Sequence, residues 1–366
     1  MKNVPIPAPA LTQTDRNFIK EAPSVATCST WSVRRRPVRS GRLPEQDVPH
    51  RAAAGHDLAR TYDRDKQMLT PWATFFSGRG EVFLRRSVEL ALEEDGPDLT
   101  AEGLFSPTDP MRAVIRAKED TLVAGLPVMA EVFAAMRADT VRYTLLAEEG
   151  RRVPAMTEVA VMEGPAVVLL KAERIILNYV THLSGIANLT ARYVRELEGT
   201  GVRLLDTRKT TPCLRWPEKY AVLVGGGCNH RRDLTEMLML KDNHIDAAGS
   251  IERAVRKLRD TYAPCPPIEV ECRTLDHVRE AVAAQADRIM MDNMRPPLLG
   301  EALELVPPHI ETEVSGGVTL ENIGELARCS RRAPDFISVG RLTHSAVAAD
   351  FSMTLQQGRT SGSALP

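Results

Sequence analysis

The chain has 366 residues, which at roughly 150 residues per domain predicts two folded domains and a remainder. Its 47 Lys and Arg against 48 Asp and Glu give a net charge of -1, so no overall basic field exists to hold nucleic acid or an anionic membrane. Hydrophobic residues make up 43% of the chain, yet the longest apolar runs fall far short of the roughly 18 to 20 residues that a membrane span requires. We therefore expect a globular protein with neither a nucleic-acid nor a membrane partner.

The first part of the chain differs in composition from the rest. Residues 1–60 hold ten Lys or Arg and five acids, a charge of +5, with scattered prolines and no sustained apolar periodicity. This pattern predicts a disordered extension over residues 1–75. An organelle transit peptide and an overlong translation start are both open interpretations of it. The six cysteines form no CxxC pair, which predicts reduced thiols and a cytoplasmic location.

Regular patterns begin near Arg79, where a helical apolar stripe runs to the turn-forming residues 95–98. Short β-like segments with one helical stretch follow between residues 111 and 164, which predicts a small α+β domain. A long amphipathic helix is expected from Pro165 to about Leu197. With this linking helix, the first domain is predicted to span residues 76–190.

β-rich runs then alternate with helical patterns. This alternation favours βαβ units and a parallel sheet, closed or nearly closed, over residues 191–352, followed by a tail at 353–366. No GxGxxG or Walker A sequence follows any of these strands, so a dinucleotide fold is disfavoured. The expected strands are 202–206, 237–240, 268–272, 288–292, 310–314 and 336–339.

Nearly every expected strand ends in polar, ionisable or glycine residues. In a βα barrel the active site is built at the carboxyl ends of the strands, so this series predicts a catalytic mouth. His182 on the long helix is interpreted as a packing residue, and a nucleophilic cysteine is disfavoured because no Cys-His-acid set is recognisable. The residues at the strand ends are 206–211, Lys241 to His244, Glu269, Glu271, Asp292, Asn293, 315–317 and Gly340, with 343–345 following.

The residues at these ends sort by charge into three kinds. Carboxylates and phosphates suit a cationic set, because arginine forks bind planar anions through paired hydrogen bonds; its members are Arg208, Lys209, His230, Arg231 and Lys241. Glycine runs at 225–227 and 315–317 allow backbone N–H groups to approach an oxygen-rich ligand. Glu271 and Asp292 offer carboxylates of the kind that hold Mg²⁺ or ribose hydroxyls. A polyanionic substrate is therefore expected.

Nine sequence blocks, in order from about Val82 to Ser352, resemble the quinolinate phosphoribosyltransferases. Several of these blocks are six or more residues long, and Asp206-Thr207-Arg208-Lys209-Thr210-Thr211-Pro212 is the longest without a gap. Departures are few: Cys213 stands where glycine is common, and Arg341 replaces a small residue beside the phosphate loop. The other blocks are 172–178, 183–187, 218–222, 225–231, 241–244, 292–293, 315–317 and 338–345.

This resemblance implies an open-sided, TIM-like α/β barrel beside a smaller α+β domain. It also implies transfer of phosphoribosyl from phosphoribosyl pyrophosphate to quinolinate with loss of CO₂, with Mg²⁺ as cofactor, in a homodimer or a higher assembly such as a hexamer. Carried over by motif, quinolinate contacts are expected from Arg208, Lys209, His230 and Arg231, with Arg174 reaching the neighbouring subunit's site. Phosphoribosyl pyrophosphate and its metal are expected at Lys241, Glu271 and Asp292, and its 5′-phosphate at Ser315, Gly316, Gly317, Gly340 and His344. Lys209, Lys241, Glu271 and Asp292 are the residues expected to act in catalysis.

Two alternatives remain open at this stage. One is a paralogue of the molybdenum-locus type that acts on another substrate, because a shared fold does not determine function. The other is a non-catalytic phosphate-binding protein. That reading predicts the loss of at least one of four chemistry-bearing residues, yet Arg208, Lys241, Glu271 and Asp292 are all present.

Overall fold

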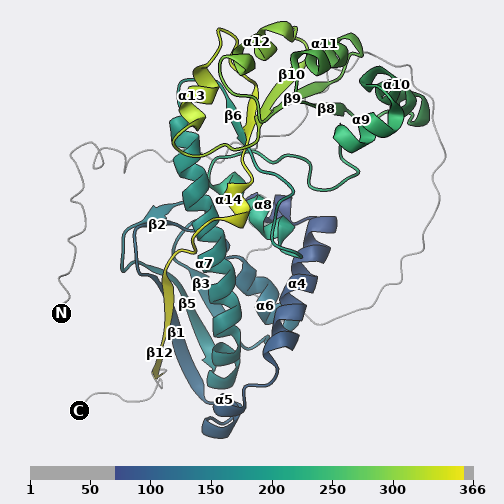
Figure 1. Ribbon diagram of the computed structural model, residues 1–366. Coiled ribbons are helices and arrows are strands. Elements are labelled where there is room, and N and C mark those ends of the chain that lie inside the picture. Colours follow the sequence, from purple (N-terminus) through teal and green to yellow (C-terminus); the bar gives the residue numbers. More distant parts are fainter. Residues whose placement is uncertain (1–70, 358–366) are drawn as a thin grey trace, which may run out of the picture.

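A computed structural model describes residues 71–357 of the chain. Figure 1 shows an antiparallel sheet in one half and a parallel sheet in the other, with the long helix α7 running between them. Within the described residues, no helix is both long enough and apolar enough to cross a lipid bilayer.

The smaller half is built on a four-stranded sheet in the order β12-β1-β5-β3. All of its neighbouring strands are antiparallel, and Val114 on β1 lies opposite Val161 on β5. Helices α4 and α6 pack on α7, and α5 packs on the first turns of α7. The elements of this half are α3 (Pro71–Phe75), α4 (Arg79–Asp95), α5 (Leu99–Leu104), β1 (Pro110–Ala117), β2 (Thr121–Leu122), α6 (Val128–Ala135), β3 (Arg142–Leu145), β4 (Arg152–Val153), β5 (Glu158–Pro165) and β12 (Phe351–Gln357).

Helix α7 (Ala166–Glu196) is the predicted linking helix, and its 31 residues contact elements of both halves. Pro165 precedes its first residue, a position where the ring's fixed φ and missing N–H are well tolerated. Buried Leu169, Ile176 and Leu183 recur every seven residues and form one buried face. At Gly185 a Cβ would lie 2.1 Å from the carbonyl oxygen of Val347, so only glycine lets the returning chain pass this close.

The larger half contains a six-stranded parallel sheet in the order β6-β11-β10-β9-β8-β7. Because the strands are parallel, their carboxyl ends meet at one edge. The prediction of a mixed α/β fold with a parallel sheet is confirmed. Its elements are β6 (Arg203–Leu205), α8 (Arg215–Val224), β7 (Leu238–Leu240), α9 (Asp242–Ala248), α10 (Ile251–Thr261), β8 (Ile268–Cys272), α11 (Leu275–Ala283), β9 (Arg288–Asp292), α12 (Leu298–Leu305), β10 (Glu311–Ser315), α13 (Ile323–Arg328), β11 (Phe336–Ser338) and α14 (Arg341–His344).

The predicted C-terminal tail at 353–366 begins inside a strand. Residues up to Gln357 belong to β12, which returns to the small sheet and pairs with β1 (Figure 1). The alternation of buried Phe351 and Met353 with less buried neighbours is the period-two pattern of a half-buried strand. Residues 358–366 lie outside the described residues. The first sheet therefore contains a strand from the far end of the chain.

The predicted disordered extension at 1–75 also overlaps folded residues. Residues 71–75 form α3, and Trp72 is only 5% exposed. Its ring centroid lies 4.3 Å from that of Phe76 and 4.9 Å from that of Tyr220 on α8. This aromatic packing gives the segment enough buried apolar surface to offset the entropy of ordering it. The rest of the predicted extension, residues 1–70, lies outside the described residues.

Candidate active site

The structure brings most of the predicted site residues to the carboxyl edge of the parallel sheet. Arg208 and Lys209 follow β6, and Lys241 directly follows β7. Glu271 lies in β8, and Asp292 and Ser315 are the last residues of β9 and β10. Gly340 precedes α14, which contains His344. Strands far apart in sequence thus supply one continuous set of side chains.

The loop after β6 is held by a fully buried carboxylate, Asp206. It pairs with the buried ammonium of Lys219 and accepts hydrogen bonds from Asn229 Nδ2 at 2.7 Å and from the backbone N–H of His230 at 2.8 Å. Burial raises the pKa of Asp206, and the adjacent Lys219 opposes that effect. A buried charge that loses its partner is strongly destabilising. Asp206 therefore fixes the segments around Arg208 and His230 relative to each other.

A second anchor connects this loop to the long helix. His182 Nε2 on α7 lies 2.8 Å from one carboxylate oxygen of Glu218, and the other oxygen accepts the backbone N–H of Thr211 at 3.1 Å. Glu218 is fully buried, so its two oxygens need these partners. His182 therefore has the packing role expected from the sequence, and it helps to position the loop after β6.

Three arginines crowd together at this end of the sheet. The Nε of Arg208 is buried without a hydrogen-bond partner among the described residues. Burial and then the charge of Arg208 lower the pKa values of Arg215 and Arg231. Arg231 Nη1 is held by the carbonyl of Met237 at 2.8 Å. Cations that repel one another and leave a donor unsatisfied favour a bound anion, because an unpaired buried donor is costly.

His230 lies beneath these arginines in a buried charge cluster, which we name the inner cluster: His230, Glu269, Arg288 and Glu313. The His230 Nε2 lies 3.0 Å from Glu269 and 3.4 Å from Glu313. Arg288 lies 3.3 Å from Glu313, with its guanidinium 4.2 Å from the centre of the Phe336 ring. Sequence reasoning missed Arg288 and Glu313, and it placed Glu269 at a strand end without giving it a role.

The protonation of His230 is decided by competing contacts. Burial would lower its pKa, but Glu313 and Glu269 outweigh burial and raise the pKa to about 10. The backbone N–H of Arg231 lies 2.7 Å from Nδ1 and favours a neutral ring. One neutral hydrogen bond contributes about 1 kcal/mol, less than two carboxylates at contact distance contribute. We therefore assign a charged His230.

His230, Glu269 and Glu313 also satisfy a distance criterion for metal ligands, because their ligand atoms lie within 4.8 Å of one another. The nearby Arg288 and the protonated His230 already balance the two carboxylates, so a cation is not required there. His230 was also expected to contact a substrate carboxylate, and that role stays a prediction. In the structure its Nε2 lies near Glu269 and Glu313, and its Nδ1 lies 2.7 Å from the backbone nitrogen of Arg231.

The acidic residues expected at the metal form a second cluster at the mouth, the outer cluster: Lys241, Asp242, Glu271, Arg273 and Asp292. Lys241 Nζ lies 2.7 Å from Glu271, whose carboxylate is largely buried. Carboxylate oxygens are hard donors of the kind that Mg²⁺ prefers, so Glu271 and Asp292 fit this ion chemically. Arg273 was not predicted, although it directly follows the last residue of β8 and so lies at the strand end next to Glu271.

Two of the three glycines expected at the 5′-phosphate, Gly316 and Gly317, adopt conformations that other residues rarely accept. Gly316 has φ +89°, and a Cβ there would lie 2.4 Å from Asn293 Oδ1. Gly317 has φ +60°, and Arg295, also missed in the sequence, lies against it. A Cβ on Gly340 would approach Lys209 Cδ at 3.1 Å and His344 Nε2 at 3.3 Å. Backbone N–H groups and several cations are thus available to an anion here.

Arg174 is the predicted site residue that lies away from this edge. Its side chain is exposed, one helical turn beyond Lys171, whose ammonium donates to the carbonyl of Gly96 at the end of α4. The half of α7 that carries Arg174 therefore packs on the smaller half of the molecule.

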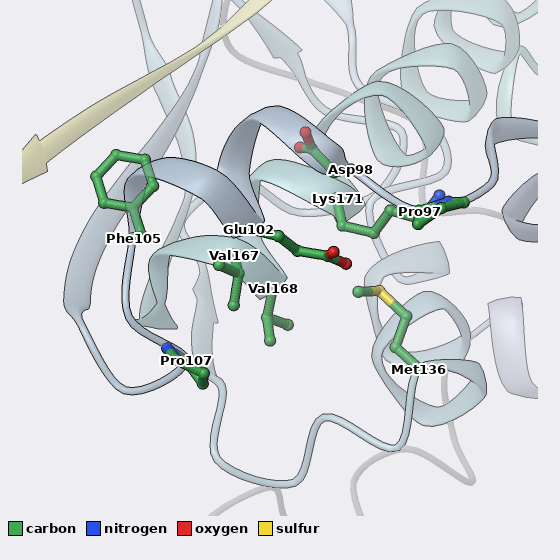
Figure 2. Close-up of a pocket in the computed structure, with 9 residues that line it drawn as sticks. All are labelled: Pro97, Asp98, Glu102, Phe105, Pro107, Met136, Val167, Val168 and Lys171. Atoms are coloured by element: carbon green, nitrogen blue, oxygen red, sulfur yellow. The ribbon is translucent and has the colours of Figure 1, made fainter.

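A cavity of about 420 Å³ also lies in the smaller half, against α5 and the first turns of α7 (Figure 2). Figure 2 shows Asp98, Glu102 and Lys171 among mostly apolar walls that include Phe105 and Met136. Two acids and one lysine do not suit a polyanion. The chemistry therefore points to the strand ends and not to this cavity.

Comparison with known proteins identifies the family of the chain. A model of the quinolinate phosphoribosyl transferase C-terminal domain matches residues 186–354, and the N-terminal domain model matches residues 98–184. The chain belongs to the quinolinate phosphoribosyl transferase family. The resemblance seen in the sequence is thereby confirmed, and the chain is a phosphoribosyltransferase of NAD biosynthesis.

Individual relatives match most of their own length. A probable carboxylating nicotinate-nucleotide pyrophosphorylase of Bacillus subtilis is 42% identical over 263 residues, which are 72% of this chain and 89% of the relative. The human carboxylating nicotinate-nucleotide pyrophosphorylase is 38% identical over 279 residues, 75% of this chain and 92% of the relative. The solved nicotinate-nucleotide pyrophosphorylase of Francisella tularensis is similar with a TM-score of 0.70 at 34% identity, covering 75% and 96% of the two chains.

Proposed function

We propose that this chain transfers the phosphoribosyl group of phosphoribosyl pyrophosphate to quinolinate, giving nicotinate mononucleotide, pyrophosphate and CO₂. Family membership and the names of the relatives support this reaction. The structural observation that carries it is the unsatisfied buried Nε of Arg208 within a crowd of arginines at the strand ends. A dicarboxylate supplies the acceptors and the negative charge that this group lacks.

Quinolinate is assigned to the side of the mouth that holds Arg208, Lys209 and Arg231. The inner cluster, in which His230 and Arg288 balance Glu269 and Glu313, anchors the chain next to Arg231 and supports this side without direct contact to the substrate. A pyridine with one carboxylate would leave some of these cations unpaired and desolvated. We therefore assign to this subsite the preference for quinolinate over nicotinate.

Phosphoribosyl pyrophosphate is assigned to the other side of the mouth. Lys241 would contact the pyrophosphate, and Glu271 and Asp292 would hold Mg²⁺ or the ribose hydroxyls. When bound, Mg²⁺ would neutralise charge on the leaving pyrophosphate. The glycines at 316, 317 and 340, with Ser315 and His344, would receive the 5′-phosphate, because their backbones allow a close approach.

The chain's own groups then favour the transfer in two ways. Lys241 and the neighbouring cations stabilise negative charge as the bond from the anomeric carbon to pyrophosphate breaks, and the quinolinate nitrogen forms the new bond to that carbon. The arginines hold the ring in line for this attack. The bond to the 2-carboxylate then breaks with loss of CO₂, and that ring carbon takes up a proton.

We propose further that the six parallel strands form an open-sided barrel, with the opening between β6 and β7. The isolated parallel bridge between Leu205 and Cys228 supports this, because it extends the β6 side. The division into domains at residues 76–190 and 191–352, and a cytoplasmic location, remain predictions. The described cysteines Cys213, Cys228, Cys265, Cys272 and Cys329 are free thiols.

A homodimer is proposed because Arg174 lies away from its own strand ends and is exposed. In this arrangement Arg174 completes the partner's quinolinate site. Mixing and reassembling Arg174→Ala with Lys241→Ala should restore about one quarter of wild-type activity, since half of the dimers are hybrid and half of their sites are intact. If activity does not recover although mass spectrometry shows that subunits have exchanged, Arg174 does not belong to the partner's site.

The reaction itself is tested with the purified full chain. Incubation with quinolinate, phosphoribosyl pyrophosphate and Mg²⁺ should yield nicotinate mononucleotide by chromatography, whereas nicotinate should react far more slowly. Arg208→Ala should remove most of the turnover, and Arg279→Ala, which changes an exposed arginine paired with Asp276, should not. Comparable turnover of both pyridines would favour a paralogue with another substrate, and no product with either would favour a binding protein.

A further inference from the structure

Arg273 occupies the centre of the outer cluster and places each guanidinium nitrogen near a different carboxylate. Its Nη1 lies 3.0 Å from Asp242, its Nη2 lies 3.4 Å from Glu271, and its Nε lies 3.6 Å from Asp292. These include both carboxylates assigned to the metal. The arginine and a divalent cation therefore face the same oxygens.

The two oxygens of Glu271 show how close this competition is. Oε1 faces Arg273 at 3.4 Å, and Oε2 faces Lys241 at 2.7 Å. The Glu271 carboxylate is largely buried, and each of its two oxygens already faces a protein cation. A metal ion that binds Glu271 must displace one of them. Arg273 is the more easily displaced from Glu271, because its contact with this carboxylate is 3.4 Å long and that of Lys241 is 2.7 Å long.

The charge count gives the direction of the effect. The outer cluster has three carboxylates and two cations, a net charge of -1, and without the arginine it would have a net charge of -2. A more negative cluster binds a divalent cation more tightly. A released guanidinium also matches the paired oxygens of a diphosphate, which the departing substrate group supplies.

We propose that Arg273 is a positioning residue that exchanges one partner for another. In the protein without metal it neutralises Glu271 and Asp292. When a metal ion binds these carboxylates, Arg273 pairs with the pyrophosphate. This inference rests on the metal role of Glu271 and Asp292 in the proposed function. It predicts opposite effects of one substitution. Losing the guanidinium strengthens binding of the metal alone and weakens binding of the metal together with pyrophosphate.

The experiment measures Mn²⁺ binding to the full chain by electron paramagnetic resonance of the free ion, with and without inorganic pyrophosphate. Arg273→Gln should bind Mn²⁺ alone about three to ten times more tightly than wild type, the effect of one removed charge at a half-exposed position. With pyrophosphate present, the same variant should bind the manganese complex several times more weakly. Arg273→Lys, which keeps the charge, should stay close to wild type with Mn²⁺ alone.

Three controls separate this inference from its premise. Arg279→Gln removes an exposed arginine outside the cluster and should change neither affinity. Glu271→Gln should weaken Mn²⁺ binding; if it does not, the metal assignment fails and Arg273 has no such role. A second outcome overturns only the role of Arg273. In it, Glu271→Gln weakens Mn²⁺ binding, but Arg273→Gln fails to show one of its two expected affinity changes or changes both affinities in the same direction. Thermal unfolding of each variant establishes that it is folded.

Discussion

The inner and outer clusters use the same chemistry at two depths of one sheet. Glu269 and Glu271 lie two residues apart on β8, on the same side, yet Glu269 belongs to the inner cluster and Glu271 to the outer. In the inner cluster the carboxylates are fully buried, and Arg288 and His230 are nearly so. In the outer cluster Arg273 and Lys241 are about half exposed. The same pairs of charges therefore operate in different dielectric surroundings.

The depth of a charged group separates structural from functional roles in these two clusters. A buried charge cannot lose its partner without a large cost, so the inner cluster is locked. A half-exposed cation exchanges its carboxylate for water or a ligand at little cost. We interpret the inner cluster as the fixed support of the quinolinate side, and the outer cluster as the part that rearranges with substrate.

The largest expected effect is on stability, from removal of an inner carboxylate. Glu313→Ala leaves His230 and Arg288 buried with too little opposing charge, and it should lower the free energy of unfolding by about 3 to 5 kcal/mol. Glu311→Ala is the matched control, because Glu311 also pairs with Arg288, at 2.7 Å, but is 38% exposed. Its loss should cost about 1 kcal/mol or less. Urea denaturation measures the free energy of unfolding of both variants. Equal losses would show that burial does not distinguish Glu313 from Glu311.

Removing an outer cation should affect turnover instead. Lys241→Ala is expected to lower kcat/KM by roughly 10² to 10³, the usual cost of one group that stabilises transition-state charge. Its free energy of unfolding should change by less than about 1 kcal/mol, because the side chain is 47% exposed. Lys257→Ala, an exposed lysine on α10, is the control. A stability loss as large as that of Glu313→Ala would contradict the assignment.

The inner cluster should also make the free energy of unfolding depend on pH. Glu313 and Glu269 raise the pKa of His230 from 6.5 to about 10 against the effect of burial, so the contribution of this histidine is complete below pH 6.5 and is lost as the pH rises toward 10. Between pH 7 and 9.5 the wild type should lose up to roughly 3 kcal/mol that His230→Gln does not lose. Parallel pH profiles of the two proteins, by chemical denaturation, would show that His230 is not charged.

The smallest effect is expected from removing residues 1–70, because no member of either cluster lies in this range. Their composition predicts little packed structure, so turnover should stay within a few-fold and the melting temperature nearly unchanged. Truncation through Phe76 is the contrast, because it also removes Trp72 and the aromatic contacts to Tyr220. That protein should melt at a clearly lower temperature. Equal melting temperatures would mean that α3 adds no stability.

Much of the architecture could be read from local pattern. The long helix from Pro165 was predicted within a residue or two of its observed ends, because its seven-residue repeat of apolar side chains is visible in the sequence. The alternation of strands with helices predicted the parallel sheet in the same way. The polar residues after successive strands then predicted one functional edge.

Other features depend on contacts that no local pattern encodes. The C-terminal strand β12 pairs with β1, more than 230 residues earlier in the chain, and α3 is held by aromatic rings on α8. His230 faces Glu269 and Glu313 because the order of the strands brings their side chains together, and Arg273 meets Asp292 across neighbouring strands. Periodicity and motifs in the sequence were enough to predict most of the elements, the family and the edge at which the polar side chains gather. Only the tertiary structure decided which charges are buried and which exchange, because depth and pairing arise when distant strands come into register.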